Sequence, residues 1–229
     1  MPVRKKAPED LTVKKALALE VIRRLKAEYP DAGCTLDYDH AWQLLVSVRL
    51  AAQCTDARVN IVVEELFAKY PSVAALAAAE PEDIEAIVKP CGLGHSKARD
   101  ISACMRMLRD KYDCRVPNTF EELLALPGVG RKSANLIMGD VFGKPAIVTD
   151  THCIRLCNKI GLVDGIKEPQ KVEMALWKII PPEEGSDLCH RFVMHGRAVC
   201  NARKPECEKC CLKDICRAAR EAAGQQAEL

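Results

Sequence analysis

The feature that most constrains the fold of this chain is a glycine-rich turn at residues 126–132. Residues 120–125 and 132–138 both read as short helices, and one proline and two glycines separate them. Glycine adopts positive φ and carries no side chain, so Gly128 and Gly130 permit a tight turn with outward-facing N–H groups. The second helix begins with unpaired N–H donors and the positive end of its dipole, which suits a phosphate diester. A plain helix–turn–helix connection with a glycine C-cap would give the same pattern.

Lys132 lies in the first turn of the second helix, beside Arg131. A helix N-terminus and a neighbouring cation both disfavour a charged ammonium group. They favour the neutral amine, which is the form that acts as a nucleophile. The position therefore suits a nucleophilic lysine, although a solvated side chain would also explain it.

Hydrophobic residues recur at helical spacing along nearly the whole chain. Leu17, Val21 and Leu25 share one face of an N-terminal helix, which we expect to pack on the C-terminal half. Residues 42–52 are apolar almost all round, as in a central buried helix. No stretch shows sustained period-two alternation, so we predict an all-α protein with a boundary near residues 143–145.

Bulk composition narrows the function only slightly. The formal charge of the 229 residues is +2, so a DNA-binding face would need uneven placement of charge. Aromatic residues make up 4%, which argues against a stacking platform for single strands. We recognise no secretory signal and no apolar run long enough to span a bilayer. We expect a cytoplasmic protein without a membrane partner.

Asp150 precedes a helical segment that runs through Ile160, and it is well placed as the N-cap. Capping N–H groups would hold its carboxyl group ionised. A structural cap is one interpretation of this residue. The other is a catalytic carboxylate beside a lysine and a developing sugar cation.

Cysteine is unusually frequent, with thirteen residues, and without a secretory signal we expect reduced thiols. Four of them have the spacing Cys-x6-Cys-x2-Cys-x5-Cys: Cys200, Cys207, Cys210 and Cys216. Thiolates this close together require a metal. Zinc usually has two separated Cys-x2-Cys pairs, so the pattern favours a [4Fe–4S] cube without excluding zinc. The loop after the first of these cysteines carries Arg203 and Lys204, which could contact phosphates.

Together these motifs resemble the endonuclease III family of DNA glycosylases. Residues 126–132 match its helix–hairpin–helix, residues 148–152 match its catalytic aspartate segment, and the cysteines match its cluster pattern. Weaker matches occur at residues 52–56, 92–98 and 195–197. The motifs run in family order over nearly the whole chain, so the set is far more specific than any one of them.

The resemblance implies two helical domains with a DNA-binding cleft between them. Residues 36–143 would form a six-helix barrel with the helix–hairpin–helix. Residues 1–35 and 144–229 would form a discontinuous domain that holds a [4Fe–4S] cluster. The implied partner is double-stranded DNA with damaged pyrimidines or abasic sites, in the nucleoid of a bacterium or archaeon, and we expect a monomer.

The resemblance also implies a bifunctional DNA glycosylase/AP lyase that removes oxidised pyrimidines. Lys132 would attack C1′ of a flipped nucleotide and cleave the strand through a Schiff base, with Asp150 as its partner. Gln53 would fill the gap left by the base, and Leu93 would wedge into the stack. The other implied DNA contacts are Gly128, Val129, Gly130, His152, Arg203 and Lys204.

Two residues depart from the family pattern. Gly94 stands where tyrosine is frequent, so we expect a more mobile wedge loop, and Cys54 stands beside Gln53 where a smaller or hydroxyl residue is common. Two other functions stay open. A monofunctional mismatch glycosylase of the same superfamily typically lacks a lysine at position 132. A non-enzymatic helix–hairpin–helix DNA-binding protein would need neither Lys132 nor Asp150.

Overall fold

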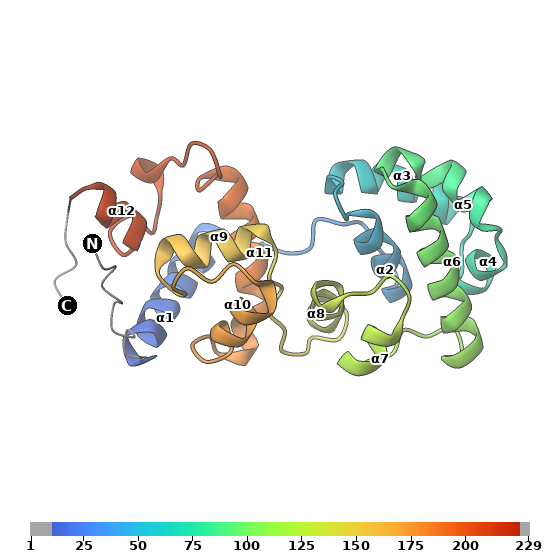
Figure 1. Ribbon diagram of the computed structural model, residues 1–229, viewed down its shortest axis with the longest axis horizontal. Helices are drawn as coiled ribbons and strands as arrows, with labels where there is room; N and C mark the ends of the chain where they lie inside the picture. The colour runs from blue at the N-terminus through green and yellow to red at the C-terminus, as the bar shows by residue number, and fades with distance from the viewer. Residues whose placement is uncertain (1–10, 225–229) are drawn as a thin grey trace, which may run out of the picture. The chain divides into compact units, whose positions relative to one another are not determined.

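The computed structural model describes residues 11–224, and within this range every regular element is a helix (Figure 1). The all-α prediction is confirmed. The outer parts of the predicted discontinuous domain, residues 1–10 and 225–229, lie outside the described residues. None of the helices in the described range is long and apolar enough to cross a bilayer.

The chain divides into two compact units. We call residues Cys34–Lys144 the hairpin unit, and residues 11–33 together with 145–224 the cysteine unit. The hairpin unit contains α2 (Ala41–Leu50), α3 (Asp56–Lys69), α4 (Val73–Ala78), α5 (Pro81–Val88), the 3-10 turn η1 (Lys89–Cys91), α6 (Gly94–Lys111), α7 (Phe120–Ala125) and α8 (Arg131–Asp140). The cysteine unit contains α1 (Leu11–Glu28), α9 (Thr151–Ile160), α10 (Pro169–Leu176), η2 (Pro182–Glu184), α11 (Gly185–Ala198), η3 (Cys207–Lys209) and α12 (Arg217–Ala222).

Side-chain caps set the starts of several helices in the hairpin unit. Thr55, Ser72 and Thr119 each accept a backbone N–H three residues further on, at the start of α3, α4 and α7. The long helix α6 packs against both α4 and α5, as Figure 1 also shows. These local signals fix where the helices begin, and the apolar faces then bring them together.

The core of the hairpin unit lies around α2, which contacts α3, α6 and α8. The prediction of a central buried helix in this region is confirmed, because its buried side chains point in nearly all directions: Trp42, Gln43, Leu44, Leu45, Val46, Ser47 and Leu50. The helix ends at Leu50, two residues earlier than its apolar pattern suggests, and a turn at residues 51–54 follows.

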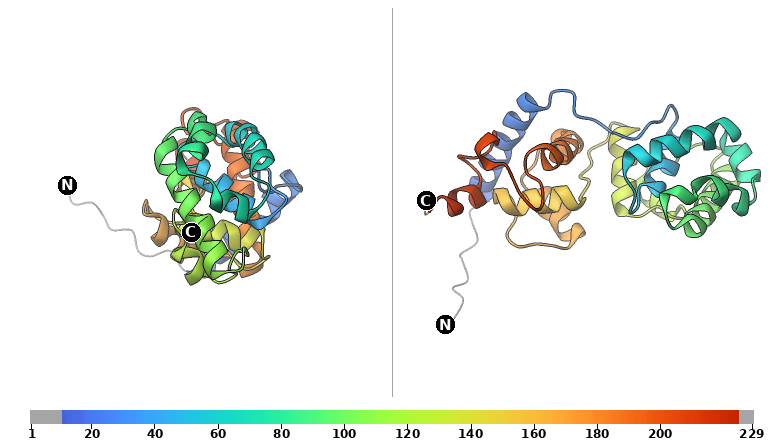
Figure 2. Two further views of the ribbon diagram at one scale, coloured as in Figure 1. Left: turned by 90° about the vertical axis from the view of Figure 1, so that its right-hand side faces the viewer. Right: turned by 90° about the horizontal axis from the view of Figure 1, so that it is seen from above.

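The cysteine unit places α1 against α11, so the prediction that the N-terminal helix packs on the C-terminal half is confirmed. Both Figure 1 and Figure 2 show the blue α1 among the orange and red C-terminal helices. Val21 and Leu25 are fully buried on its inner face. Arg24 donates to the carbonyl oxygen of Cys211 at 2.8 Å and pairs with Asp214.

Candidate functional site

The glycine turn of the hairpin unit exposes its backbone. The turn closes where the Val129 N–H donates to Leu126 O at 3.1 Å, and both Gly128 and Gly130 are exposed. The first helical hydrogen bond of α8 runs from the Ala134 N–H to Gly130 O. The N–H groups of its first turn therefore lie before the first i→i−4 hydrogen bond of the helix. Leu126, with extended backbone, is the C-cap of α7. The plain glycine C-cap interpretation is therefore wrong.

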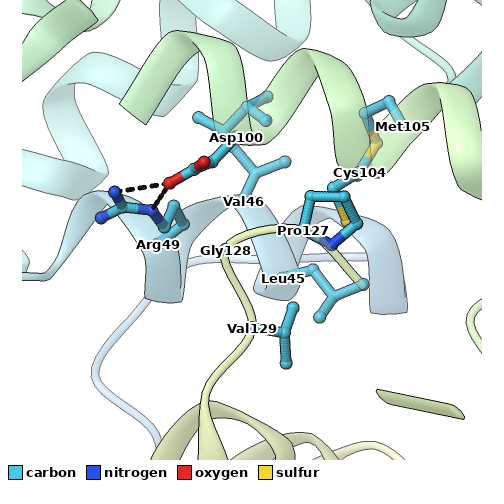
Figure 3. A pocket seen from close by; sticks show the side chains of 10 residues that line it. Leu45, Val46, Arg49, Asp100, Cys104, Met105, Pro127, Gly128 and Val129 are labelled. Atoms are coloured by element: carbon cyan, nitrogen blue, oxygen red, sulfur yellow. Dashed lines mark hydrogen bonds and ion pairs between the residues drawn. The ribbon is translucent and has the colours of Figure 1, made fainter. Parts of the chain in front are cut away.

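Gly128 sits against an ion pair between α2 and α6 (Figure 3). Its φ is +75°, and a Cβ there would lie 2.8 Å from Asp100 Cβ and 3.1 Å from Arg49 Cδ. Arg49 Nε donates to Asp100 Oδ2 at 2.7 Å, and Arg49 Nη2 donates to Ser96 Oγ at 3.2 Å. Apolar side chains line the rest of this contact: Leu45, Val46, Ile101, Cys104, Met105, Pro127 and Val129. Both the ion pair and these side chains hold the turn on the core of the hairpin unit.

Gly128→Ala is expected to lower the free energy of unfolding by about 1–3 kcal/mol, because it adds both left-handed strain and a clash. Gly130→Ala is the matched control, since Gly130 has φ −97° and a Cβ added there would have no other atom within 4 Å. Because Gly130 is the N-cap of α8, where alanine is less favourable than glycine, the control should cost no more than about 1 kcal/mol. Urea unfolding of the two variants measures the difference. Equal shifts would show that the contact with Asp100 does not restrict position 128.

Lys132 is exposed in the first turn of α8. The guanidinium of the neighbouring Arg131 lies 4.9 Å from the ring centroid of Phe120, in a cation–π contact with α7. The Arg131 side chain thus packs against α7. The amine of Lys132 remains accessible to a partner molecule.

Gln53 and Leu93 lie in two strained turns of the hairpin unit. Both have left-handed backbone, with φ of 58° and 52°, which non-glycine residues adopt at a cost. Both side chains are exposed, and Leu93 is a large apolar group that is 58% exposed. The turns follow directly after α2 and η1. Strained backbone that presents an apolar side chain to solvent is typical of a binding element.

Asp150 is the N-cap of α9, as predicted. Its Oδ1 accepts the Cys153 N–H at 2.7 Å, and the residue is partly buried. Asp150 belongs to the cysteine unit, whereas Lys132 belongs to the hairpin unit. The cap role and a catalytic role are compatible, because the cap bond uses only one carboxylate oxygen.

His152 lies two residues further on, beside Arg155. Arg155 Nη2 lies 3.2 Å from His152 Nδ1 and donates to the carbonyl oxygens of Gly196 and Cys200, at 3.1 and 2.8 Å. A Cβ on Gly196 would lie 2.3 Å from His152 Nδ1, so α11 needs glycine at this position. Arg155 therefore connects α9 with α11 and with Cys200, the first of the four patterned cysteines.

The four patterned cysteines surround one cavity of about 230 Å³. It is lined by Cys200, Cys207, Cys210 and Cys216, with Lys159 and Lys213 among its other residues. Burial raises the pKa of Cys200, and it raises that of Cys210 to about 11. Cys210 Sγ lies 3.3 Å from Nε2 of the buried His195, whose Nδ1 lies 3.1 Å from the Tyr29 hydroxyl.

The four cysteines that line this cavity are a thiol donor set that fits a cysteine-bound metal group, either zinc or an iron–sulfur cluster. In residues 11–224 no group of three His, Cys, Asp or Glu side chains is arranged to hold a single metal ion. The position of His195 beside Cys210 was not predicted from the sequence, although the short motif at residues 195–197 was noted.

The exposed Arg203 and Lys204 follow Cys200 in a turn where Lys204 N donates to Asn201 Oδ1 at 2.7 Å.

Comparison with known proteins identifies the family. A model of the HhH-GPD superfamily of base excision DNA repair proteins matches residues 46–182. Endonuclease III of Synechocystis sp. is 43% identical over 204 residues, which cover 89% of this chain and 93% of that protein. The chain belongs to the endonuclease III family. Endonuclease III of Escherichia coli K12 is 38% identical over 202 residues, covering 88% of this chain and 95% of that protein.

Solved structures agree with the membership in the endonuclease III family. A trapped endonuclease III–DNA covalent intermediate superposes with a TM-score of 0.86 at 39% identity, covering 91% of this chain and 98% of that one. A thermostable thymine-DNA glycosylase reaches a TM-score of 0.81 at 23% identity, which shows a shared fold alone. The superfamily match contains the two strained turns, the hairpin and Asp150, and the cysteine pattern follows it in the chain.

Within this endonuclease III family member, the departure at Gly94 has a structural setting. A Cβ on Gly94 would lie 3.1 Å from Lys89 Cα, tighter than ordinary van der Waals contact. Any larger residue there would require the backbone of η1 or of α6 to move. The expected greater mobility of the turn at Leu93 stays a prediction.

Proposed function

We propose that this endonuclease III family member, a DNA glycosylase/AP lyase of base excision repair, excises oxidised pyrimidines from duplex DNA through a Schiff base on Lys132. The observation that carries the proposal is the exposed Lys132 in the first turn of α8, directly after a glycine turn that presents backbone N–H groups. A mismatch glycosylase or a non-enzymatic DNA-binding protein would have no use for an amine there.

The proposed chemistry depends on Lys132 and Asp150. The neutral amine of Lys132 forms a bond to C1′, and the glycosidic bond breaks as the base leaves with its electron pair. Loss of an amine proton lets the nitrogen lone pair open the sugar ring: the C=N bond forms as the C1′–O4′ bond breaks, and O4′ takes up a proton. The resulting protonated imine acidifies the C2′ proton. Removal of that proton breaks the 3′ C–O bond by β-elimination. Asp150 stabilises the sugar cation and assists deprotonation of the lysine.

DNA contacts complete the proposed site. The N–H groups of the turn at Gly128, Val129 and Gly130 would bind a phosphate, and Arg203 and Lys204 would bind others. Gln53 and Leu93 would enter the base stack, which their exposed, strained turns support. His152, held beside Arg155, would contact the backbone near the flipped nucleotide.

Borohydride trapping on duplex DNA tests the proposed function. Wild-type protein should release thymine glycol, cleave the strand and leave a covalent protein–DNA adduct on reduction. Base release without an adduct would indicate a monofunctional glycosylase. Binding without base release or adduct would indicate a non-enzymatic DNA-binding protein. Either result would contradict the proposal.

We propose that Cys200, Cys207, Cys210 and Cys216 hold a [4Fe–4S] cluster. Such a cluster would cross-link the chain within residues 200–216, because all four thiolates come from this stretch. His195 is placed to donate Nε2–H to Cys210 Sγ, with Nδ1 accepting from the Tyr29 hydroxyl. Histidine and tyrosine would then fix the orientation of one ligand.

Iron analysis and spectroscopy check the cluster. We expect about four irons per chain and a broad absorbance near about 400 nm. Cys210→Ser should lose this absorbance and loosen the segment around it. Cys211→Ser is the matched control and should keep the cluster, because Cys211 is not among the residues that line the cavity. One zinc per chain without iron would contradict the assignment.

A further inference from the structure

Lys97 is a fully buried lysine in the hairpin unit, and the proposed chemistry does not use it. Its Nζ donates to Leu50 O and to Cys91 O, both at 2.8 Å. Burial lowers the pKa of Lys97. Burying an amine is costly unless hydrogen bonds compensate for the lost hydration, so this side chain must contribute something specific.

The two carbonyl groups are the last of their helices. Leu50 is the final residue of α2, and Cys91 is the final residue of η1. Terminal carbonyls have no intrahelical partner, and a lysine is a suitable group to satisfy them. One side chain thus joins the ends of two elements that are about forty residues apart in sequence.

The strained turns begin directly after these two carbonyls. Gln53 follows Leu50 by three residues, and Leu93 follows Cys91 by two. The Lys97 N–H also donates to Leu93 O at 3.0 Å, but this is the first backbone bond of α6 and would form with any residue at position 97. Both turns are therefore attached to one residue of α6, through side-chain bonds that lie in the buried interior of the hairpin unit.

We propose that Lys97 is a positioning residue that clamps the turns of Gln53 and Leu93 to each other, so that both side chains enter the DNA stack as one unit. This inference rests on the proposed function. Left-handed backbone at Gln53 and Leu93 is maintained only where the surroundings over-determine it. Lys97 supplies that constraint through its hydrogen bonds to Leu50 O and Cys91 O, just before each turn. Without these bonds each turn would relax independently.

The variants are Lys97→Met, which keeps the length but donates no hydrogen bond, and Lys111→Met, an exposed lysine of the same helix, as matched control. Lys97→Gln, which keeps a shorter donor, is the second variant if Lys97→Met does not fold. Single-turnover excision is measured with excess protein on two substrates. One holds thymine glycol paired with adenine, and the other holds the same lesion in an unpaired loop.

We expect Lys97→Met to slow excision from the paired duplex by about ten- to a hundredfold, and from the unpaired loop by less than about threefold. A 2-aminopurine next to the paired lesion should show a correspondingly slower rise in fluorescence. A residue that only stabilises the fold would lower both rates equally. Equal losses on the two substrates, or rates that match those of Lys111→Met, would overturn the proposal.

Hydrogen exchange of the free protein separates this inference from the proposed function. In Lys97→Met, amides in residues 51–55 and 91–95 should exchange at least about tenfold faster, while α4 and α5 keep their protection. Unchanged exchange in both turns would overturn the clamp even if the enzyme excises thymine glycol. If wild-type protein neither excises nor traps, the proposed function fails, and the exchange data still decide whether the clamp exists.

Discussion

Lys132→Gln is expected to bind abasic duplex DNA with near wild-type affinity and to give no borohydride-trapped adduct. Glutamine keeps most of the length and hydrogen bonding of lysine but has no nucleophilic amine. Because Lys132 is exposed, the substitution should change the free energy of unfolding by less than about 0.5 kcal/mol. Cleavage of abasic DNA should fall by roughly four orders of magnitude or more, the scale of losing a covalent nucleophile.

Lys111→Gln is the control for a general loss of surface charge, since Lys111 is an exposed lysine at the end of α6 in the same unit. It should trap and cleave as wild type does. Single-turnover cleavage and gel analysis of the reduced adduct measure both effects. A trapped adduct in Lys132→Gln would mean that another amine is the nucleophile and that the proposed mechanism is wrong.

The sequence predicted the fold class because helix formation depends largely on local patterns. The apolar spacing of Leu17, Val21 and Leu25 acts within a few residues, and the structure has a helix there. The packing environment of Gly128 could not be predicted from such local patterns. It depends on Arg49 and Asp100, which meet the turn only after α2 and α6 have packed.

Lys97 shows how a useful signal can be missed. It lies four residues before Ile101 and eight before Met105, on the apolar face of α6. A charged residue on an apolar face suggests a buried role, but its partners here are backbone carbonyls, which no sequence pattern marks. The position of His195 beside Cys210 was hidden for the same reason, since it requires α11 to lie against the cysteine segment.

Asp150→Asn is expected to leave the fold intact while single-turnover excision of thymine glycol falls by roughly two to four orders of magnitude. Asparagine is as good an N-cap as aspartate, and its side-chain oxygen can still accept the Cys153 N–H that Asp150 Oδ1 accepts at 2.7 Å. The variant therefore removes the negative charge and little else. DNA binding should be kept or become tighter, because a charge that repels phosphates is lost.

Two further substitutions at the same position separate the cap from the charge. Asp150→Ser keeps a capping oxygen but no carboxylate, so it should fold like Asp150→Asn and be as slow. Asp150→Ala removes the cap as well and should cost about 1 kcal/mol of stability in urea unfolding. If excision tracked stability across the three variants, the cap alone would explain them. If Asp150→Asn excised at the wild-type rate, Asp150 would be only the start of α9, and the stabilisation of the sugar cation would have to come from another group.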